Sequence, residues 1–359
     1  MRQFKDIYRG RKVLVTGHTG FKGSWLSLWL QEMGAEVAGI SLPPEDALSH
    51  WTTLGLEIDH NCLDIRQGAE LSKVVERLRP EIVFHLAAQP LVRRSYQNPA
   101  ETWSTNVVGT ANILDACRST KSVQAIVLVT SDKCYENKEW AWGYRENDSL
   151  GGHDPYSASK AAAELVAASY RKSFFHESGV PLLATARAGN VIGGGDWSVD
   201  RLVPDLVRAV SKQQILEVRY PNATRPWQHV LESLSGYLSL GQYLLEGNGN
   251  YAKPWNFGPA AEGNRSVADM LSLLNAEWPS LRWQQSTDAH LHEAQLLYLD
   301  SSMARQQLDW RPVWDFKQAV HATAGWYQAW IERAETISRK QLADYCDSAL
   351  QQGLSWASE

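Results

Sequence analysis

The chain has 359 residues, of which 44% are hydrophobic and 21% charged, as expected of a soluble protein with one large or two modest domains. Its net charge is −5 and it has no block of lysine or arginine, so neither composition nor charge suggests a nucleic-acid partner. Without a signal peptide or an apolar run near the roughly 18 residues of a membrane span, and with four scattered cysteines, it is expected to be cytoplasmic, reduced and free of a structural metal.

Apolar stretches alternate with helical patterns through the first half of the chain. We expect strands at 12–17, 35–42, 81–87 and 124–131, and helices at 25–34 and 98–118. Nearly continuous apolar strands separated by helices are typical of a parallel sheet covered on both faces. Right-handed crossovers make such a sheet doubly wound, with ligands at the carboxyl ends of its strands. The predicted fold class is therefore α/β with a doubly wound parallel sheet.

The pattern changes after about residue 190. Glycine-rich and aromatic stretches such as "GNVIGGGDW" (189–197) and "RPWQHV" (225–230) indicate shorter elements that cover the sheet. We expect residues 1–190, with a returning segment near 230–260, to form the first domain. The remainder of 191–359 is expected to form a smaller, mixed α/β domain that ends in helix.

A glycine-rich turn joins the first expected strand to the first expected helix. In "VTGHTGFKGSWL" (15–26), Gly17, Gly20 and Gly23 follow one another at three-residue spacing. Glycines there permit a tight turn and close approach of a pyrophosphate, which then rests on the helix N-terminus. This spacing also arises by chance, but the strand–turn–helix context is the one that dinucleotide binding requires.

The acidic residue that usually holds the adenosine ribose is absent. Ser41 stands at the end of the second strand, and no arginine stands there to accept a 2′-phosphate. Asp64, after a probable third strand, has two interpretations, a contact to the adenine ring or the N-cap of a helix. NAD is therefore favoured over NADP only by the chemistry expected of the site.

Polar residues follow the apolar strand in "VTSDKCY" (129–135), so that Ser131, Asp132 and Lys133 stand at a strand end. Tyr156 and Lys160 are four residues apart and share one face of a helix. A cation beside a phenol is expected to lower the tyrosine pKa. The phenolate can then take a proton from an alcohol while hydride leaves the same carbon.

Together with "HLAAQP" (85–90) and Asn106 in "TNVVGT" (105–110), these features resemble the extended short-chain dehydrogenase/reductase family. The resemblance covers nearly the whole chain and implies a Rossmann-type domain joined to a smaller nucleotide-sugar-binding domain. It places the catalytic hydroxyl, tyrosine and lysine at Ser131, Tyr156 and Lys160. The residues that we assign to the NAD cofactor are Gly17, Thr19, Gly20, Phe21, Lys22, Gly23, Ser41, Asp64, Ile65, Ala87, Ala88, Gln89, Asn106 and Lys160.

Within that family the chain resembles the sugar-nucleotide 4,6-dehydratases, which place an acidic pair after the catalytic hydroxyl. "SDKCY" and "GGGDWSVDRLVPD" (193–205) imply CDP-glucose as the substrate. The implied reaction oxidises carbon 4, eliminates water across carbons 5 and 6, and returns hydride to carbon 6. Asp132 is the expected acid and Lys133 stands where relatives have the carbon-5 base. Alternatively, Lys133 only pairs with Asp132 or Glu136, and Tyr156 or a water removes the proton.

The resemblance also assigns the nucleotide-sugar end. Relatives carry an arginine near position 290, whereas this chain has "DAHLHEAQ" (288–295), which leaves the second phosphate contact open. The residues that we assign to the substrate are Asn190, Arg201, Leu202, Val203, Arg225, His229 and His292.

Two other functions remain open. A nucleotide-sugar epimerase, or a dehydratase of another base specificity, would use the same fold, and a cofactor-sensing protein without catalysis is a remote alternative. The family further implies a homodimer through a four-helix bundle of helices 98–118 and 156–176, with a tetramer possible. It also implies a place in lipopolysaccharide synthesis, as a supplier of dideoxysugars for bacterial O-antigen.

Overall fold

The computed structural model describes residues 3–177, 179–286 and 296–358. At its centre is a seven-stranded sheet in which every neighbouring pair is parallel, in the order β11-β6-β5-β4-β1-β2-β3. The strands are β1 (Lys12–Thr16), β2 (Glu36–Ser41), β3 (Asp59–Cys62), β4 (Ile82–His85), β5 (Ala125–Val129), β6 (Leu182–Ala188) and β11 (Pro254–Phe257). The prediction of a doubly wound parallel sheet is confirmed.

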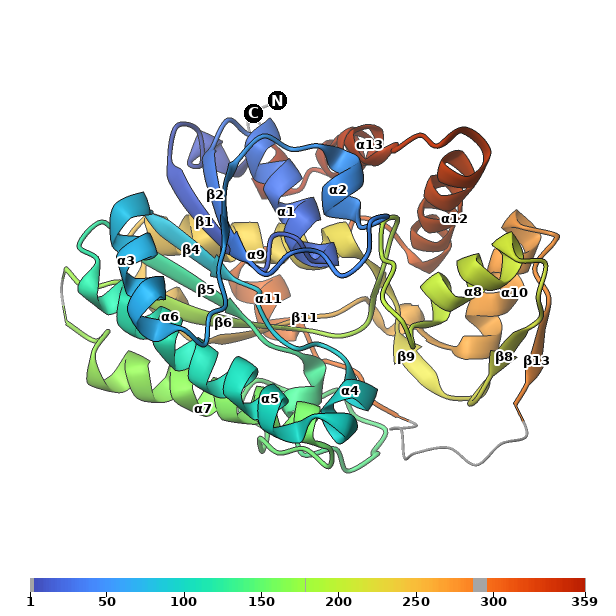
Figure 1. Ribbon diagram of the computed structural model, residues 1–359, viewed down its shortest axis with the longest axis horizontal. Helices are drawn as coiled ribbons and strands as arrows, with labels where there is room; N and C mark the ends of the chain where they lie inside the picture. Colours follow the sequence, from blue (N-terminus) through green and yellow to red (C-terminus); the bar gives the residue numbers. More distant parts are fainter. Residues whose placement is uncertain (1–2, 178, 287–295, 359) are drawn as a thin grey trace.

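Helices cover both faces of this sheet (Figure 1). One face carries α3 (Gly68–Leu78), α6 (Gly109–Ser119) and α7 (Pro155–Ser173), packed through buried residues such as Leu71 and Ile113. The other face carries α1 (Phe21–Glu32) and α9 (Val230–Leu245), which is almost wholly buried. The continuous apolar runs of β4 and β5 follow from this double covering, because neither side of those strands meets water.

The helix predicted at 98–118 is present, but it is not uniform. It follows α4 (Val92–Gln97) and consists of α5 (Pro99–Trp103), a π-helical turn (Ser104–Val108) and α6. A π turn inserts one extra residue into the helical repeat and re-aims the side chains within it. Asn106 lies in this turn and is buried.

After residue 190 the strands are short, as expected, but several helices are long, with 16 residues in α9 and 18 in α12 (Phe316–Arg333). Shorter helices here are α8 (Leu202–Ser211), α10 (Val267–Glu277) and α11 (Ser302–Gln307). Three two-stranded pairs join β7 (Val191–Ile192) to β10 (Gln228–His229), β9 (Thr224–Pro226) to β12 (Asn264–Ser266), and β8 (Leu216–Val218) to β13 (Trp283–Gln285). Figure 1 shows α8, α10 and the β8 and β9 pairs beside the main sheet.

Two further helices complete the fold. The short α2 (His50–Leu54) follows β2, and α13 (Ser338–Gln351) packs near α1, where the rings of Trp29 and Tyr345 meet edge to face. Among the described residues, no helix is both long and apolar enough to cross a membrane.

Candidate active site

A cavity runs along the carboxyl ends of the central strands and under the short elements that follow residue 190. Most of the residues singled out from the sequence line it. These are Gly17, Thr19, Gly20, Phe21, Lys22, Gly23, Ser41, Asp64, Ile65, Ala87, Ala88, Gln89, Ser131, Asp132, Lys133, Tyr156, Lys160, Asn190, Arg201, Leu202, Val203 and Arg225. Asn106 and His229 do not line it, and His292 lies outside the described residues.

The glycine turn between β1 and α1 has the shape that a pyrophosphate requires. Gly17 has a φ of +75°, and a Cβ atom there would lie 2.7 Å from the backbone nitrogen of Ala87. A side chain at Gly23 would collide with the carbonyl of Gly17. Because α1 begins at Phe21, its unpaired N–H groups face the same turn. The residues present therefore fit a dinucleotide, with its phosphates at the start of α1.

The side chain of Lys22 extends from the same turn toward α9. Its Nζ donates a hydrogen bond of 3.2 Å to the hydroxyl of Tyr237 on α9. Burial and the charge of Arg201 lower the pKa of Lys22 to about 7, and Asp132 opposes this shift. Lys22 thus adds to the electrostatics of the catalytic end as well as to the glycine turn.

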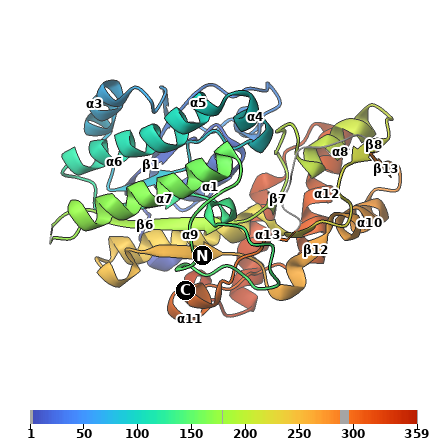
Figure 2. The same cartoon turned by 90° about the horizontal axis from the view of Figure 1, so that it is seen from below.

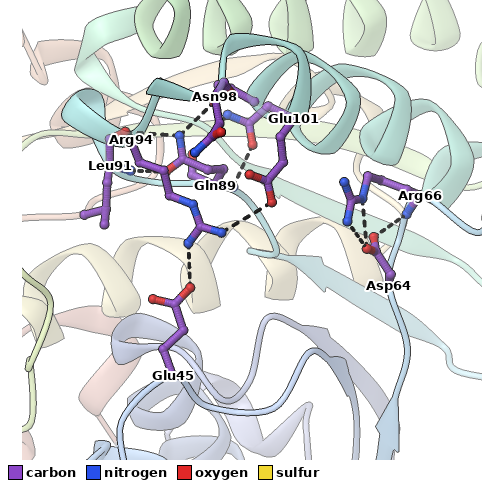
Figure 3. A network of polar contacts seen from close by, with 10 residues as sticks. Glu45, Asp64, Arg66, Gln89, Leu91, Arg94, Asn98 and Glu101 are labelled. Carbon is purple, nitrogen blue, oxygen red and sulfur yellow. Dashed lines mark hydrogen bonds and ion pairs between the residues drawn. The ribbon is translucent and has the colours of Figure 1, made fainter. Parts of the chain in front are cut away.

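The far wall of the cavity is a charged network (Figure 3). Arg94 on α4 donates to Glu45 at 2.6 Å, across the cleft, and to Glu101 on α5 at 3.3 Å. Arg66 donates to Asp64 at 2.8 Å, and this bond holds the pKa of the Asp64 carboxyl below its usual value. Both arginines therefore already have carboxylate partners. This disfavours binding of the 2′-phosphate that distinguishes NADP from NAD.

The structure also decides the role of two residues at this wall. Asp64 accepts from the backbone N–H of Arg66 at 2.9 Å and faces the cavity, whereas the next helix, α3, begins only at Gly68. It is therefore not a helix N-cap. Ser41, which replaces the usual acid, lies 2.6 Å from the hydroxyl of Thr19, so that β2 is tied to the glycine turn by neutral groups.

Asn106 supports the cavity wall from behind, and its contact with the cofactor stays a prediction. Its Oδ1 accepts from the backbone N–H of Gln89 at 2.8 Å, and its Nδ2 donates to the Gln89 carbonyl and to Ser159. All of its amide atoms are thereby engaged with protein. Asn106 fixes the loop after β4, which itself lines the cavity.

The residues after β5 form a compact turn, which we call the catalytic turn (Ser131–Cys134). The Ser131 hydroxyl accepts from the backbone N–H of Lys133 and donates to Asp132 Oδ1 at 2.9 Å. Lys133 Nζ lies 3.4 Å from Asp132 Oδ1 and 3.4 Å from Asn190 Oδ1. The Asp132 carboxylate is almost completely buried, whereas Lys133 is partly exposed. Of the two pairings considered for Lys133, the one with Asp132 is observed, while Glu136 lies near Lys138.

Tyr156 and Lys160 lie on the buried face of α7, as predicted, but the expected lowering of the tyrosine pKa is wrong for the protein alone. Burial raises the pKa of Tyr156 to about 12, and a hydrogen bond from Ser131 only partly offsets this rise. Lys160 Nζ points to the carbonyl of Val129 at 3.4 Å, and burial lowers its own pKa to about 8. At the Tyr156 phenol, desolvation therefore outweighs the opposing charge of Arg201.

The residues that we assign to the nucleotide sugar lie in different surroundings. Arg201 is held by Asp196 at 2.9 Å and lies close enough to influence the charge of Tyr156. Arg225 faces the cavity and donates to the carbonyl of Thr224. His229 is wholly buried beside Trp314, accepts from the Leu231 N–H and is the N-cap of α9. It lies in the core and does not line the cavity, so its contact with the substrate stays a prediction.

Sequence reasoning missed a buried ion pair beneath this site, between Glu164 on α7 and Arg187 on β6. Each is a charged residue in an otherwise apolar context, "KAAAELVAA" (160–168) and "LLATARA" (182–188). That isolation is the signal that marks them, because a lone charge on a buried face requires a partner.

Comparison with known proteins agrees with this geometry. The family model for GDP-mannose 4,6 dehydratase matches residues 14–252. The CDP-glucose 4,6-dehydratase of Salmonella typhimurium is 46% identical over 351 residues, covering 95% of this chain and 98% of the relative. A dTDP-glucose 4,6-dehydratase of Xanthomonas campestris is 25% identical, covering 89% of this chain and 94% of its own.

Solved structures share the fold. An epimerase from Methanothermobacter thermautotrophicus superposes with a TM-score of 0.81 at 23% identity, covering 94% of this chain and 96% of its own. A dTDP-glucose 4,6-dehydratase from Streptomyces venezuelae, solved with NAD bound, gives a TM-score of 0.74 at 24% identity. It covers 88% of this chain and 96% of its own.

Replacement of Gly17 tests the glycine turn. Gly17→Ala should weaken binding of NAD, the cofactor expected from the sequence, by at least about tenfold, because the methyl group would press on the backbone of Ala87. Gly247→Ala is the matched control, since Gly247 has a φ of +76° but nothing within 4 Å of its added Cβ. Calorimetric titration of both variants measures the difference, and equal affinities would contradict a pyrophosphate at this turn.

Proposed function

Since the chain belongs to the GDP-mannose 4,6 dehydratase family, we propose that it is a hydro-lyase that converts CDP-glucose into CDP-4-keto-6-deoxyglucose and water. The observation that carries the proposal is 46% identity to a CDP-glucose 4,6-dehydratase over nearly the full length of both chains. The acid–lysine pair of the catalytic turn supports the same activity. An epimerase needs no acid at carbon 6, so Asp132 and Lys133 favour the dehydratase over that alternative.

NAD is the cofactor, and the residues of the cavity fit it. The glycine turn accommodates the pyrophosphate, and the wall of Glu45, Asp64 and Glu101 opposes a further phosphate on the ribose. When bound, the nicotinamide supplies the chemistry of accepting a hydride from carbon 4 of the sugar and returning it to carbon 6. Its positive charge also favours ionisation of the buried Tyr156 phenol, which the protein alone does not achieve.

The protein's own residues move the protons. Tyr156 takes the proton of the sugar 4-hydroxyl, with the Ser131 hydroxyl beside it and the charge of Arg201 favouring the phenolate. By family resemblance, Lys160 on the same face of α7 is the lysine that assists this tyrosine. The resulting 4-ketone acidifies the proton on carbon 5. Neutral Lys133 removes that proton, and protonated Asp132 delivers one to the departing 6-hydroxyl.

The proton balance closes over one turnover. Elimination leaves a lysine cation and an aspartate anion, the charged pair that lies at 3.4 Å in the structure. As carbon 6 is reduced, Lys133 returns its proton to carbon 5, which restores the neutral base. Tyr156 has then gained the proton that Asp132 has lost, so transfer of one proton from the phenol to the carboxylate restores both groups for the next turnover.

A substrate panel tests the activity. With NAD present, CDP-glucose should give the 4-keto-6-deoxy product, seen as the alkaline absorbance of that product. The dTDP-, UDP- and GDP-linked hexoses should react at least about tenfold more slowly, as different base contacts allow. Faster turnover of another nucleotide would overturn the CDP assignment, and interconversion of hexose epimers without water loss would overturn the dehydratase.

The roles of the catalytic turn can be separated by exchange of the carbon-5 proton with solvent. Lys133→Met should still oxidise the sugar but should lose carbon-5 exchange, because the base is gone. Asp132→Asn should retain exchange and slow water loss by about 10² or more, because only the acid is missing. Proton NMR in deuterated water follows both. Wild-type exchange in Lys133→Met would show that Tyr156 or a water is the base.

We further propose a homodimer that pairs the α5–α7 surface with its copy across a two-fold axis. Figure 2 shows these helices side by side on one face of the molecule. Trp103 and Val108 are 40% and 51% exposed there, and Leu165 on α7 is 61% exposed. An apolar surface of neighbouring helices supports an isologous contact, in which each copy presents the same patch.

Leu165→Glu should therefore give a monomer at micromolar concentration, because it places a charge in the proposed contact. Leu350→Glu on α13 is the matched control, as Leu350 is also exposed, at 37%, but lies on another face. Light scattering distinguishes the two masses. A monomeric wild-type protein would contradict the proposal.

The wider setting is also proposed. Residues 1–190 with the returning segment near 230–260 form the cofactor domain, and the remainder forms the substrate domain. The four cysteines are free, in keeping with a cytoplasmic enzyme. Its product would supply deoxysugars for surface polysaccharide such as O-antigen.

A further inference from the structure

A fully buried ion pair lies directly beneath the proposed catalytic residues. Glu164 and Arg187 each expose about 2% of their side chain, and Arg187 Nη2 lies 2.8 Å from Glu164 Oε2. Glu164 is one helical turn after Lys160 on α7, and Arg187 is on the neighbouring strand β6. None of the reaction steps described above uses either residue.

The carboxylate of Glu164 is held by strands on both sides. Its Oε1 accepts from the Thr130 hydroxyl at 2.5 Å, and its Oε2 accepts from the Thr185 hydroxyl at 2.8 Å as well as from Arg187. Although burial opposes it, these partners hold the pKa of Glu164 below its usual value. Thr130 is the residue immediately before the catalytic turn.

The guanidinium of Arg187 reaches the other end of the turn. Its Nη1 donates to the Tyr135 hydroxyl at 2.7 Å and to the Glu146 carbonyl at 3.0 Å. The Tyr135 hydroxyl in turn donates to Asn256 Oδ1 at 2.7 Å. Tyr135 is the residue immediately after the catalytic turn. One ion pair therefore holds the residues on both sides of Ser131–Cys134 and joins them to the helix of Tyr156 and Lys160.

Stability alone is a weak reason for such a pair. Two desolvated charges lose hydration that their attraction hardly exceeds, and apolar residues of similar volume often give an equally stable core. An ion pair with fixed hydrogen bonds does provide orientation, because the planar guanidinium and the carboxylate form these bonds only in certain directions. The reaction needs that orientation, since an acid, a hydroxyl and a phenol must converge on one sugar.

We propose that Glu164 and Arg187 are positioning residues that fix the catalytic turn against α7, and so set the distance between Asp132 and Tyr156. The proposal rests on the dehydratase function above. Tyr135 is the third positioning residue, because its hydroxyl accepts from Arg187 and its backbone directly follows the catalytic turn. Glu164 has a second effect, because its negative charge lies one turn from Lys160 and favours the lysine cation.

Removal of one hydroxyl tests the positioning with little change of volume. Tyr135→Phe should lower kcat for dehydration by about tenfold or more, with the KM for CDP-glucose and the Kd for NAD changed by less than about twofold. The matched control is Tyr345→Phe on α13. The Tyr345 hydroxyl is also fully buried, donating to Glu232 at 2.8 Å and to Ser235 at 3.2 Å, but it does not contact the catalytic turn.

Tyr345→Phe should lower the free energy of unfolding but leave kcat unchanged. Both kcat values are measured well below the melting temperatures of the two variants. Equal kcat values in Tyr135→Phe and Tyr345→Phe would overturn the proposal and leave the pair a structural one. An inactive wild-type protein on CDP-glucose would instead contradict the proposed function, so the two failures are distinguishable.

A pH profile provides a second measurement. Lys160 acts as a cation, and burial lowers its pKa to about 8 against the opposing charge of Glu164, so activity falls as the pH rises through that value. Glu164→Gln removes the opposing charge and should move this loss of activity to lower pH. A uniform decrease at every pH, with the alkaline limb unmoved, would contradict the electrostatic effect. If Glu164→Gln does not fold, the Tyr135→Phe comparison still decides the positioning.

Discussion

Desolvation at the carboxyl edge of the sheet is the constraint on which the rest of the site depends. Asp132, Tyr156 and Lys160 each expose less than a tenth of their surface, so each must be neutral or partnered. Tyr156 responds by holding its proton, with a pKa near 12, and Lys160 by holding its proton less tightly, with a pKa near 8. Neither group is set for catalysis by the protein alone. In the mechanism proposed above, a bound cationic ring would supply the missing charge, and ionisation of the phenol would then depend on the cofactor.

The same constraint explains how charges are distributed along the cavity. Arginines and carboxylates at the outer wall, such as Arg94 and Glu45, are partly exposed, and surface pairs of this kind contribute little stability. In the function proposed above, the net negative charge of this wall favours NAD over NADP, which carries one more phosphate. Charges at the inner end are buried, and there Asp132 contacts both Ser131 and Lys133 while Glu164 contacts Arg187. In the mechanism proposed above, these buried charges set the geometry of the catalytic residues and the positions of the protons that they transfer.

Much of this could be predicted from the sequence. Continuous apolar strands depend on local pattern and predict the parallel sheet, which is confirmed. The glycine spacing and the polar run after β5 are also local, and the structure brings both to one cavity. Asn106 and His229 do not line that cavity, because sequence shows that a residue is near a site but not which way it faces. The π turn directs Asn106 to the loop after β4, and the start of α9 turns His229 into the core.

Other features depend on contacts between distant segments. Arg94 meets Glu45 only because α4 and the loop after β2 flank one cleft, and Glu164 meets Arg187 only because α7 packs against β6. The pKa of Tyr156 could not be inferred from the lysine on the same helix face, because burial of the phenol decides the direction of the shift. Local spacing predicts which groups meet on one helix, but not how much water remains around them.

The central claim is that one cavity oxidises and reduces the same sugar, so that no net redox change occurs. CDP-glucose deuterated at carbon 4 tests it most directly, with the product analysed by NMR and mass spectrometry. The account predicts that deuterium appears in the methyl group at carbon 6, without consumption of added NAD. Product that carries no deuterium in its methyl group, or turnover that consumes NAD in proportion to product, would contradict it.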